Sequence, residues 1–244
     1  MDFNPEISLK MANSLLSEVI EEIEPFQKSL QKVDAQAGDA PFLETMKADF
    51  QLSRQGAALT GKLKEAMTLA ESVRKEAPGL YLDEGEPLTA DIVVAKAHFC
   101  EGILHASKAN WPAAESAFRL AVSTIPTPDG QLRVGYAVAA QGNRDAAKVE
   151  FQRILAEYPK SDEAVEAAKA IRELERMPMK RRTTALILSI FLGWAGADRF
   201  YLGYWGAGAV KLLTFGGVYV WWLIDILRIL ANKLPAANGM QLER

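Results

Sequence analysis

The sequence has little of the residues on which most catalytic and metal centres depend. Its 244 residues include a single cysteine, Cys100, and two histidines, His98 and His105. One cysteine cannot form an internal disulfide, which fits a reducing compartment. Two histidines seven positions apart on one helix are separated by roughly 10 Å along its axis, too far to share one zinc ion. We therefore expect no metal site and no cofactor.

Several motifs of catalysis and nucleic-acid binding are also missing. The sequence contains no GxxxxGK[ST] loop, no paired-cysteine spacing and no HExxH motif. It has 28 Lys and Arg residues against 31 Asp and Glu, a net charge of −3, and so lacks a basic field for nucleic acid. The first ten residues lack a basic patch followed by an apolar core, so no cleavable signal peptide is expected. We expect a protein that is not an enzyme and does not bind nucleic acid.

Long uncharged runs are concentrated near the C-terminal end. Thr183–Ala197 contains no charged residue, and Phe200–Ile224 contains only Lys211. A helix over the first run would be about 22 Å long and one over Gly206–Leu230 about 37 Å, against a hydrocarbon core of about 30 Å. The second run is long enough to cross a bilayer with tilt, whereas the first either crosses fully or re-enters. The pattern predicts a two-helix hairpin in lipid; a hairpin buried in a soluble core is the alternative.

Basic residues outside the two runs predict an orientation for this hairpin. Lys180, Arg181 and Arg182 precede the first run, and Arg228 and Lys233 close the second. By the positive-inside rule, both chain ends then lie in the cytoplasm. Aromatic residues gather at the turn and near the end of the second run, as they do at membrane interfaces.

The two runs also carry an ordered motif. It consists of Phe191-Leu192-Gly193, Gly196, Asp198-Arg199-Phe200-Tyr201-Leu202-Gly203, Gly206, Gly208, Trp222 and Asp225. The motif resembles the TM-two domain, a family of two transmembrane helices joined by a DRF (or HRF) turn. The resemblance implies a small membrane hairpin, often fused to other domains in bacteria, and no settled biochemical activity. The hairpin positions that we take from it are Gly193, Gly196, Asp198, Arg199, Phe200, Tyr201, Gly203 and Asp225.

Charged residues inside this hairpin need partners or an interface, because an unpaired charge in lipid is costly. We expect Asp225 to pair with Arg181, Arg182 or Arg228, and we expect Asp198–Arg199 to fix the turn at the opposite surface. A structural role for these charges is favoured over a transport role. Small residues along both runs would let neighbouring copies pack closely, which allows a homo-oligomer through the hairpin.

The middle of the chain repeats with a period of 33 residues. The repeating positions are Gly102, Ala114, Phe118, Ala121 and Pro126, then Gly135, Ala147, Phe151, Ile154 and Pro159, with a fainter earlier copy at Gly61, Ala66, Ala70, Val73 and Pro78. This order of residue types resembles the tetratricopeptide repeat. Small residues let two helices approach closely, the aromatic ring fills the gap between them, and proline ends the second helix. An unrelated helical bundle is the alternative.

Segments around the repeats are also predicted to be helices or loops. Asn4 caps an amphipathic helix that continues to residue 33, with a kink or break at Pro25. Residues 34–40 and 79–90 are predicted loops. Residues 161–177 are predicted to form a terminal helix that closes the open end of the repeat array.

The tetratricopeptide resemblance implies a concave groove lined by the first helix of each repeat. Carried over by position, the lining residues are Gln51, Gln55, Lys96, Phe99, Ile103, Leu132 and Tyr136. Phe99 and Ile103 replace polar positions of the carboxylate clamp found in some family members, so this groove suits an amphipathic helix or an apolar peptide. Residues 5–33 of the same chain are one candidate occupant.

We therefore predict an all-α protein, a tetratricopeptide-like solenoid followed by a two-helix transmembrane hairpin. The expected parts are residues 1–40 (helix and loop), 41–177 (repeats and terminal helix), 178–234 (hairpin) and 235–244 (tail). The predicted function is a membrane-anchored scaffold or adaptor that holds an unidentified protein or peptide partner at the cytoplasmic face. The alternative is a small oligomeric pore or transport-associated subunit. The expected location is a membrane that the chain crosses more than once, of the bacterial inner-membrane type.

Overall fold

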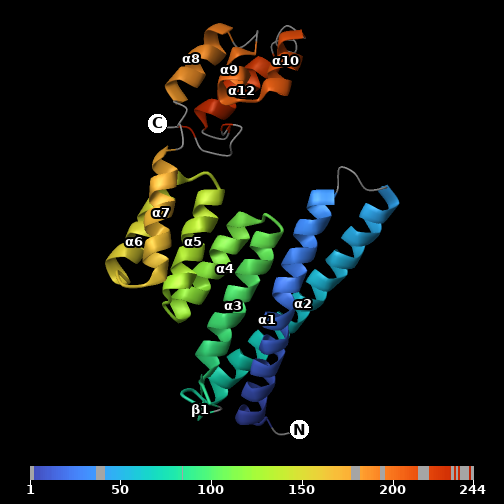
Figure 1. The fold of residues 1–244 in the computed structure, drawn as a ribbon, viewed down its shortest axis with the longest axis vertical. Helices are drawn as coiled ribbons and strands as arrows, with labels where there is room; N and C mark the ends of the chain where they lie inside the picture. The colour runs from blue at the N-terminus through green and yellow to red at the C-terminus, as the bar shows by residue number, and fades with distance from the viewer. Residues whose placement is uncertain are drawn as a thin grey trace. The chain divides into compact units, whose positions relative to one another are not determined.

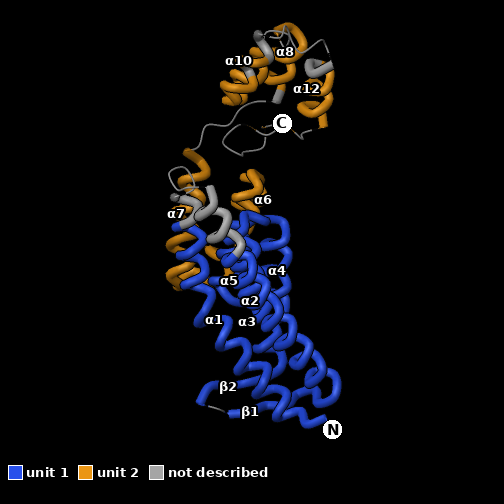
Figure 2. Tube along the Cα trace, turned by 90° about the vertical axis from the view of Figure 1, so that its right-hand side faces the viewer, with its two compact units in different colours: residues 1–137 blue, residues 138–244 orange. Residues whose placement is uncertain are grey.

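The fold is mostly helical. Figure 1 shows a computed structural model that describes residues 3–36, 42–83, 85–176, 182–192, 196–213, 220–231, 234, 236 and 242. The elements are α1 (Pro5–Gln36), α2 (Phe42–Glu76), β1 (Leu82–Asp83), β2 (Pro87–Leu88), α3 (Ala90–Ser107), α4 (Trp111–Thr124), α5 (Pro128–Ala140), α6 (Arg144–Glu157), α7 (Asp162–Arg176), α8 (Arg182–Leu192), α9 (Ala197–Leu202), α10 (Trp205–Leu213) and α12 (Val220–Leu230). The chain divides into an N-terminal unit, Met1–Ala137, and a C-terminal unit, Val138–Arg244 (Figure 2).

Helix α1 begins as the sequence predicts and continues further than predicted. The backbone N–H of Ile7 donates to Asn4 Oδ1 at 3.2 Å, so Asn4 is the cap. Of the kink or break predicted near Glu24, the break is wrong, because α1 continues through Pro25 to Gln36. Ile23 and Phe26, on either side of Pro25, are both buried in the core, and this packing outweighs the cost of a proline in a helix. The predicted loop at 34–40 therefore begins later, and residues 37–41 lie outside the described ranges.

Helices α1, α2 and α3 share one apolar core. Antiparallel α1 and α2 pack along their lengths, and α3 packs against both (Figure 1). The fully buried members include Leu9, Leu16 and Val19 from α1, Leu59 and Val73 from α2, and Val93 from α3. Burying one such side chain stabilises a fold by about 1.5–3 kcal/mol, so α1 is part of the core.

Helix α2 does not contain the helix pair expected from the fainter repeat copy. It is one continuous helix from Phe42 to Glu76. Gly61 lies inside it, and a Cβ added there would meet no atom within 4 Å. This glycine therefore does not serve a close helix approach. The partner that packs against α2 along its length is α1.

Helices α3 and α4 pack as the repeat pattern predicts. A Cβ added at Gly102 would lie 2.5 Å from Cε1 of Phe118, so only glycine allows this approach. Ala114 and Phe118 are both buried, and α4 ends at Thr124, two residues before Pro126.

The segment between α2 and α3, predicted as a surface loop, contains a small hairpin. Strands β1 and β2 pair antiparallel, with Leu82 opposite Leu88. Leu88 is buried in the core of the N-terminal unit. Thr89 then caps α3, because its hydroxyl accepts from the N–H of Ile92 at 3.3 Å.

In the C-terminal unit, α6 packs against α7. Phe151 and Ile154 of α6 are fully buried. Helix α7 is the predicted terminal helix, and Ser161 caps it by accepting from the N–H of Ala164 at 3.2 Å. Its buried residues are Ala164, Ala167, Ala170 and Leu174.

In the part of the chain that the structure describes, the helices of the uncharged runs are shorter than the two predicted. Helix α8 covers part of the first run, α9 spans the turn between the runs, α10 lies within the second run, and α12 begins there and continues to Leu230. Among the described residues, no helix is both long enough and apolar enough to span a membrane. Leu234, Ala236 and Leu242, from the end of the chain, are buried with Leu202 and Ile229 in the apolar cluster of this region.

Candidate functional site

A cluster of polar side chains is buried where α8, α9 and α12 meet. Arg199 Nε donates to Asp225 Oδ2 at 3.0 Å, and its Nη2 donates to Oδ1 of the same carboxylate. Ser189 Oγ donates to Asp198 Oδ2 at 3.3 Å. Arg199 is 7% exposed, and the other three residues are fully buried. A two-point ion pair of this kind fixes both distance and orientation between α9 and α12.

Two glycines of the motif set the backbone around this cluster. Gly196 at the start of α9 has φ 74°, and Gly203 at its end has φ 95°. Both values lie in the left-handed region, which glycine adopts without the steric cost of a Cβ. The N–H of Tyr204 donates to the carbonyl of Arg199 at 2.8 Å, and the Arg199 guanidinium lies 5.5 Å from the centre of the Tyr204 ring. The turns at Gly196 and Gly203 therefore help to place the Arg199 side chain in the buried cluster.

The structure shows the surroundings of the motif charges. Asp198 and Arg199, which were expected to fix the turn, are both buried within the domain. Asp225 pairs with Arg199, a partner that the sequence did not suggest. Arg181 and the side chain of Arg182, two of the expected partners, lie outside the described residues. The sequence contained one indication of the Arg199–Asp225 pair, because two opposite charges in apolar runs are expected to form an ion pair.

The other motif positions have plain structural roles or are not described. Phe200 contacts Trp205, with 5.5 Å between the ring centres. Tyr201 is half-buried and packs against the apolar cluster of the region. Gly193 lies outside the described residues.

Among the described residues, the outside of this region is mostly apolar, although Arg228 is also exposed, whereas its centre is polar. Ten large apolar side chains of α8, α10 and α12 are exposed: Ile187, Ile190, Phe191, Leu192, Trp205, Val210, Leu223, Ile224, Leu227 and Leu230. We call these ten residues the outer apolar surface. A water-soluble domain normally places such residues inside and charges outside.

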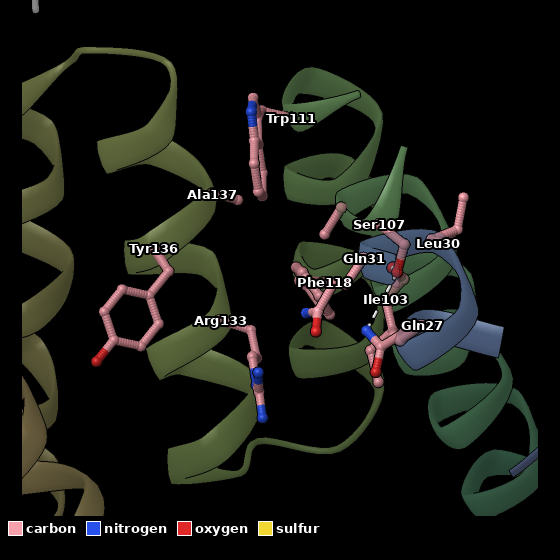
Figure 3. Close-up of a pocket in the computed structure, with 11 residues that line it drawn as sticks. Gln27, Leu30, Gln31, Ile103, Ser107, Trp111, Phe118, Arg133, Tyr136 and Ala137 are labelled. Atoms are coloured by element: carbon pink, nitrogen blue, oxygen red, sulfur yellow. Dashed lines mark hydrogen bonds between the residues drawn. The ribbon is translucent and has the colours of Figure 1, made fainter. Parts of the chain in front are cut away.

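Two cavities in the N-terminal unit follow successive parts of α3. The first, of about 380 Å³, is lined by Gln27, Leu30, Gln31, Ile103, Ala106, Ser107, Trp111, Phe118, Arg133, Tyr136 and Ala137 (Figure 3). The second, of about 370 Å³, is lined by Ile92, Ala95, Lys96, Phe99, Ala121, Ile125, Thr127 and Asp129. In both, α3 and α5 contribute residues together with α4. We call the two cavities together the α3–α5 groove.

Hydrogen bonds and ring contacts hold the walls of this groove. Gln27 Nε2 donates to Ser107 Oγ at 3.1 Å, which fixes α1 to α3 at one wall (Figure 3). The rings of Phe99 and Phe118 meet edge to face, with 5.6 Å between their centres, one ring lining each cavity. Arg133 Nε donates to Asp129 Oδ1 at 3.3 Å along α5. The groove is thus mainly apolar with a few polar groups at its edges.

The predicted groove residues separate into three sets. Ile103 and Tyr136 line the first cavity, and Lys96 and Phe99 line the second. Leu132 is buried. The remaining two, Gln51 and Gln55, are exposed on α2 and line neither cavity.

Helix α1 supplies groove residues that the sequence reasoning missed. Gln27, Leu30 and Gln31 form part of the lining of the first cavity. The C-terminal part of residues 5–33 therefore forms part of the wall of the first cavity, instead of the occupant for which this segment was a candidate. Leu30 and Gln31 lie three and four residues after Gln27, so the three side chains share one helix face. This spacing could have identified them from the sequence. Trp111 and Arg133 were also missed.

The histidines and the cysteine of α3 show no arrangement for nucleophilic or metal chemistry. His98 Nδ1 lies 3.3 Å from Glu101 Oε2, and this hydrogen bond lowers the pKa of the Glu101 carboxyl. Burial raises the pKa of the Cys100 thiol to about 11, although Lys96 opposes the shift. A thiol with such a pKa is almost never the reactive thiolate at neutral pH. No group of three or more metal-ligating side chains occurs among the described residues.

Comparison with known proteins identifies one part of the chain. Residues 178–227 match the TM2 domain family, a range that contains the whole predicted hairpin motif. A TM2 domain-containing protein of Caenorhabditis elegans is 49% identical over 57 residues, covering 23% of this chain and 32% of that protein. Almondex of Drosophila melanogaster is 52% identical over 59 residues, 24% of this chain and 21% of that protein. Human TM2 domain-containing protein 3 is 54% identical over 57 residues, 23% of each chain.

These matches confirm the TM2 domain at residues 178–227 and are limited to it. Each relative is matched over a third of its length or less. The tetratricopeptide-like repeats are not supported by a family match, and no solved structure matches the chain. The three relatives are animal proteins, so they do not support the expected bacterial source.

Proposed function

We propose that the TM2 domain at residues 178–227 embeds in a lipid bilayer and tethers a helical unit, Met1–Ala137, whose α3–α5 groove binds a protein partner. The proposed role is that of an adaptor without enzymatic activity. The observation that carries the membrane part is the distribution of side chains in α8–α12. Charged and polar groups are buried at the centre, and large apolar groups face outward.

Simple energetics favour lipid around the outer apolar surface. Each exposed Leu, Ile or Phe that leaves water gains about 1.5–3 kcal/mol. The buried Arg199–Asp225 pair would meanwhile be protected from the cost of a lone charge in hydrocarbon. Both terms act in the same direction, so the domain is most stable with lipid outside and the ion pair inside.

Orientation is tested by labelling single cysteines. The starting protein is the full chain with Cys100→Ala, expressed in cells. A cysteine replacing Trp205, which is 71% exposed, reports on the turn side of the domain. A cysteine replacing Leu120, which is exposed on α4, reports on the N-terminal unit.

If both chain ends lie in the cytoplasm, an impermeant maleimide added to intact cells labels only the first of these variants. Both become labelled after the membrane is opened. Labelling of the Leu120→Cys variant in intact cells would contradict the proposed orientation.

The groove suits an apolar segment of a protein partner. Its two cavities have the size of ordinary ligand sites, and most of their lining is apolar. An amphipathic helix or short apolar peptide fits such a lining, with polar groups at the edges fixing its direction.

Site-specific cross-linking tests the groove in the full-length protein. A photoreactive amino acid replaces Lys96 in the second cavity or Arg133 in the first, and the control position is Leu120. We expect one partner of defined mass to be captured from both groove positions and not from Leu120. Equal capture from all three positions would remove the groove from the proposal.

A second function, a small pore or transport subunit, is favoured by one observation. Ser189, Asp198, Arg199 and Asp225 form a buried polar cluster inside an otherwise apolar domain. Such residues in membrane domains often mark ion or proton paths. Liposomes that contain the protein should then leak protons or ions, and Asp225→Asn should change the rate. Liposomes that stay tight at every protein density would exclude this function.

A further inference from the structure

A third cavity, of about 350 Å³, lies between α2 and α3 and is lined by none of the groove residues. Its base is apolar, with Leu63 and Met67 from α2 and Leu104 from α3. Lys64, His105 and Lys108 also line it, so three groups that are cationic or can become cationic surround an apolar base.

The side chains of the two lysines are exposed. Within the described ranges, neither ammonium group forms an ion pair or a hydrogen bond. Lys108 reaches across to α2, where its Nζ lies 3.3 Å from the position of a Cβ built on Gly56. Gly56 thus leaves the room in which the Lys108 ammonium lies. Lys62 of α2, by contrast, pairs with Glu18 and Glu22.

The one acidic residue of the lining is already engaged. One carboxylate oxygen of Glu101 lies 3.3 Å from His98 Nδ1, and the other lies 3.9 Å from His105 Nε2. The charge of Glu101 therefore offsets at most one of the two ammonium groups. With two lysines against one glutamate, and His105 counted as neutral, the lining has a formal net charge of about +1.

We propose that this cavity binds a small phosphate-bearing molecule with an apolar part. Lys64 and Lys108 neutralise the phosphate, because lysine binds phosphate as a point charge. A phosphate group carries up to two negative charges, enough for both lysines, whereas a carboxylate carries one. Leu63, Met67 and Leu104 contact the apolar part. The phosphate comes either from a soluble phosphate ester or from a lipid headgroup.

Ligand-dependent stabilisation tests the proposal on the full chain in phosphatidylcholine nanodiscs. The readout is the temperature at which buried Cys100 becomes accessible to a maleimide, which reports unfolding of the N-terminal unit. Sodium phosphate is compared with sodium chloride at equal ionic strength. We expect phosphate to raise this temperature in proportion to the logarithm of its concentration above Kd.

Two double variants of equal charge separate the site from general ionic effects. Lys64→Gln with Lys108→Gln should abolish the rise. Lys32→Gln with Lys75→Gln, two exposed lysines of the same unit outside this lining, should retain it. An equal rise in both double variants, or no effect of any phosphate source in the wild type, would overturn the proposal.

The lipid source is distinguished by nanodiscs that contain phosphatidic acid. If these raise the unfolding temperature of the wild type without free phosphate, and Lys64→Gln with Lys108→Gln loses the effect, the ligand is a headgroup. A rise with free phosphate alone identifies a soluble phosphate compound.

Discussion

At the scale of single residues, two helical glycines have opposite consequences for stability. Gly102 lies against the ring of Phe118, where a Cβ would be 2.5–2.9 Å from ring atoms. Gly61 faces open space in α2. We expect Gly102→Ala to destabilise the unit by about 1–3 kcal/mol through overpacking. We expect Gly61→Ala to stabilise it by about 0.5–1 kcal/mol, because alanine is the better helix former.

Urea unfolding of the full chain in detergent, followed by Cys100 accessibility, measures both effects. The two variants make the same chemical change in the same unit, so each is the control for the other. A neutral Gly102→Ala variant would show that α4 can move away from α3 without loss.

Cys100 is predicted to be unreactive in the folded chain. Its side chain is buried, and burial raises its pKa to about 11, so little thiolate is present at pH 7. A maleimide should modify it much more slowly than a cysteine placed at exposed Leu120 in a Cys100→Ala chain. In high denaturant the two rates should become similar. Fast modification of the native protein would mean that α3 opens readily.

Residue types predicted some of these contacts and missed others. The 33-residue period placed Gly102 against Phe118 because both positions belong to one local helix pair. The pair Arg199–Asp225 joins residues 26 positions apart. Periodicity carries no information on such a contact, because its formation depends on where the chain turns at Gly203 and on how α12 packs on α8.

At the scale of helices, the apolar face of a helix was easier to predict than the helix that packs against this face. Part of the apolar face of α1 was evident from spacing, and Leu16 and Val19 are buried as that spacing requires. Ile7 and Ile20 follow the same spacing but are exposed, whereas Leu9 is buried and was not predicted. That α1 packs on α2 and α3 was not evident, since many apolar faces could cover it. For the same reason part of the groove lining was placed on Gln51 and Gln55 of α2, whereas α1, and not α2, contributes lining residues to the first cavity.

Pro25 gives a prediction about α1. Proline inside a helix removes one backbone hydrogen bond and costs about 3 kcal/mol relative to alanine. Pro25 is exposed, so its ring contributes little to the core. We expect Pro25→Ala to stabilise the N-terminal unit by up to about 3 kcal/mol, measured by the same unfolding assay. Ser17→Ala, at another exposed position of α1, should change stability far less; a destabilised Pro25→Ala chain would mean that the core requires a bend here.

The ion pair between α9 and α12 gives a second prediction at the scale of helices. Removing one partner of a buried pair leaves the other charge uncompensated and costs about 3–5 kcal/mol. We expect Asp225→Leu to destabilise the TM2 domain by this amount. Adding Arg199→Met to it should restore most of the loss, because two apolar side chains can replace a buried pair.

Unfolding in mixed micelles, read from tryptophan fluorescence, measures both variants. Asp225→Leu with Ser17→Ala is the matched double variant without rescue. A rescue failure would show that the pair has a role beyond holding α9 and α12 together.

At the scale of the whole molecule, the TM2 domain was predictable because its sequence motif is continuous and specific. Residues 178–227 contain glycines, the Asp198-Arg199-Phe200 turn and Asp225 in a fixed order. The N-terminal unit has no such order. Its helices follow from apolar periodicity and from caps such as Asn4 and Thr89. Which cavities form between them depends on the volumes of side chains from three or four helices, which no local pattern encodes.

The membrane proposal makes one further prediction, which concerns the outer apolar surface. Leu223 and Leu227 lie four residues apart on α12 and are both more than half exposed. Aspartate at either position should leave the polar centre of the domain intact, because neither side chain is buried there. In lipid each new carboxylate would cost about 2.5–3.5 kcal/mol near the middle of the bilayer. Leu223→Asp with Leu227→Asp should therefore weaken membrane association by more than about 1,000-fold, since every 1.4 kcal/mol is a factor of ten.

Flotation of the full chain with phosphatidylcholine vesicles measures this loss. The control is Leu120→Asp with Val149→Asp, which adds the same charge at exposed apolar positions of α4 and α6. If lipid surrounds the domain, the control variant floats like the wild type and the α12 variant stays in the aqueous fraction. If both variants float equally, α12 does not face hydrocarbon, and another protein surface is the remaining way to cover these ten side chains.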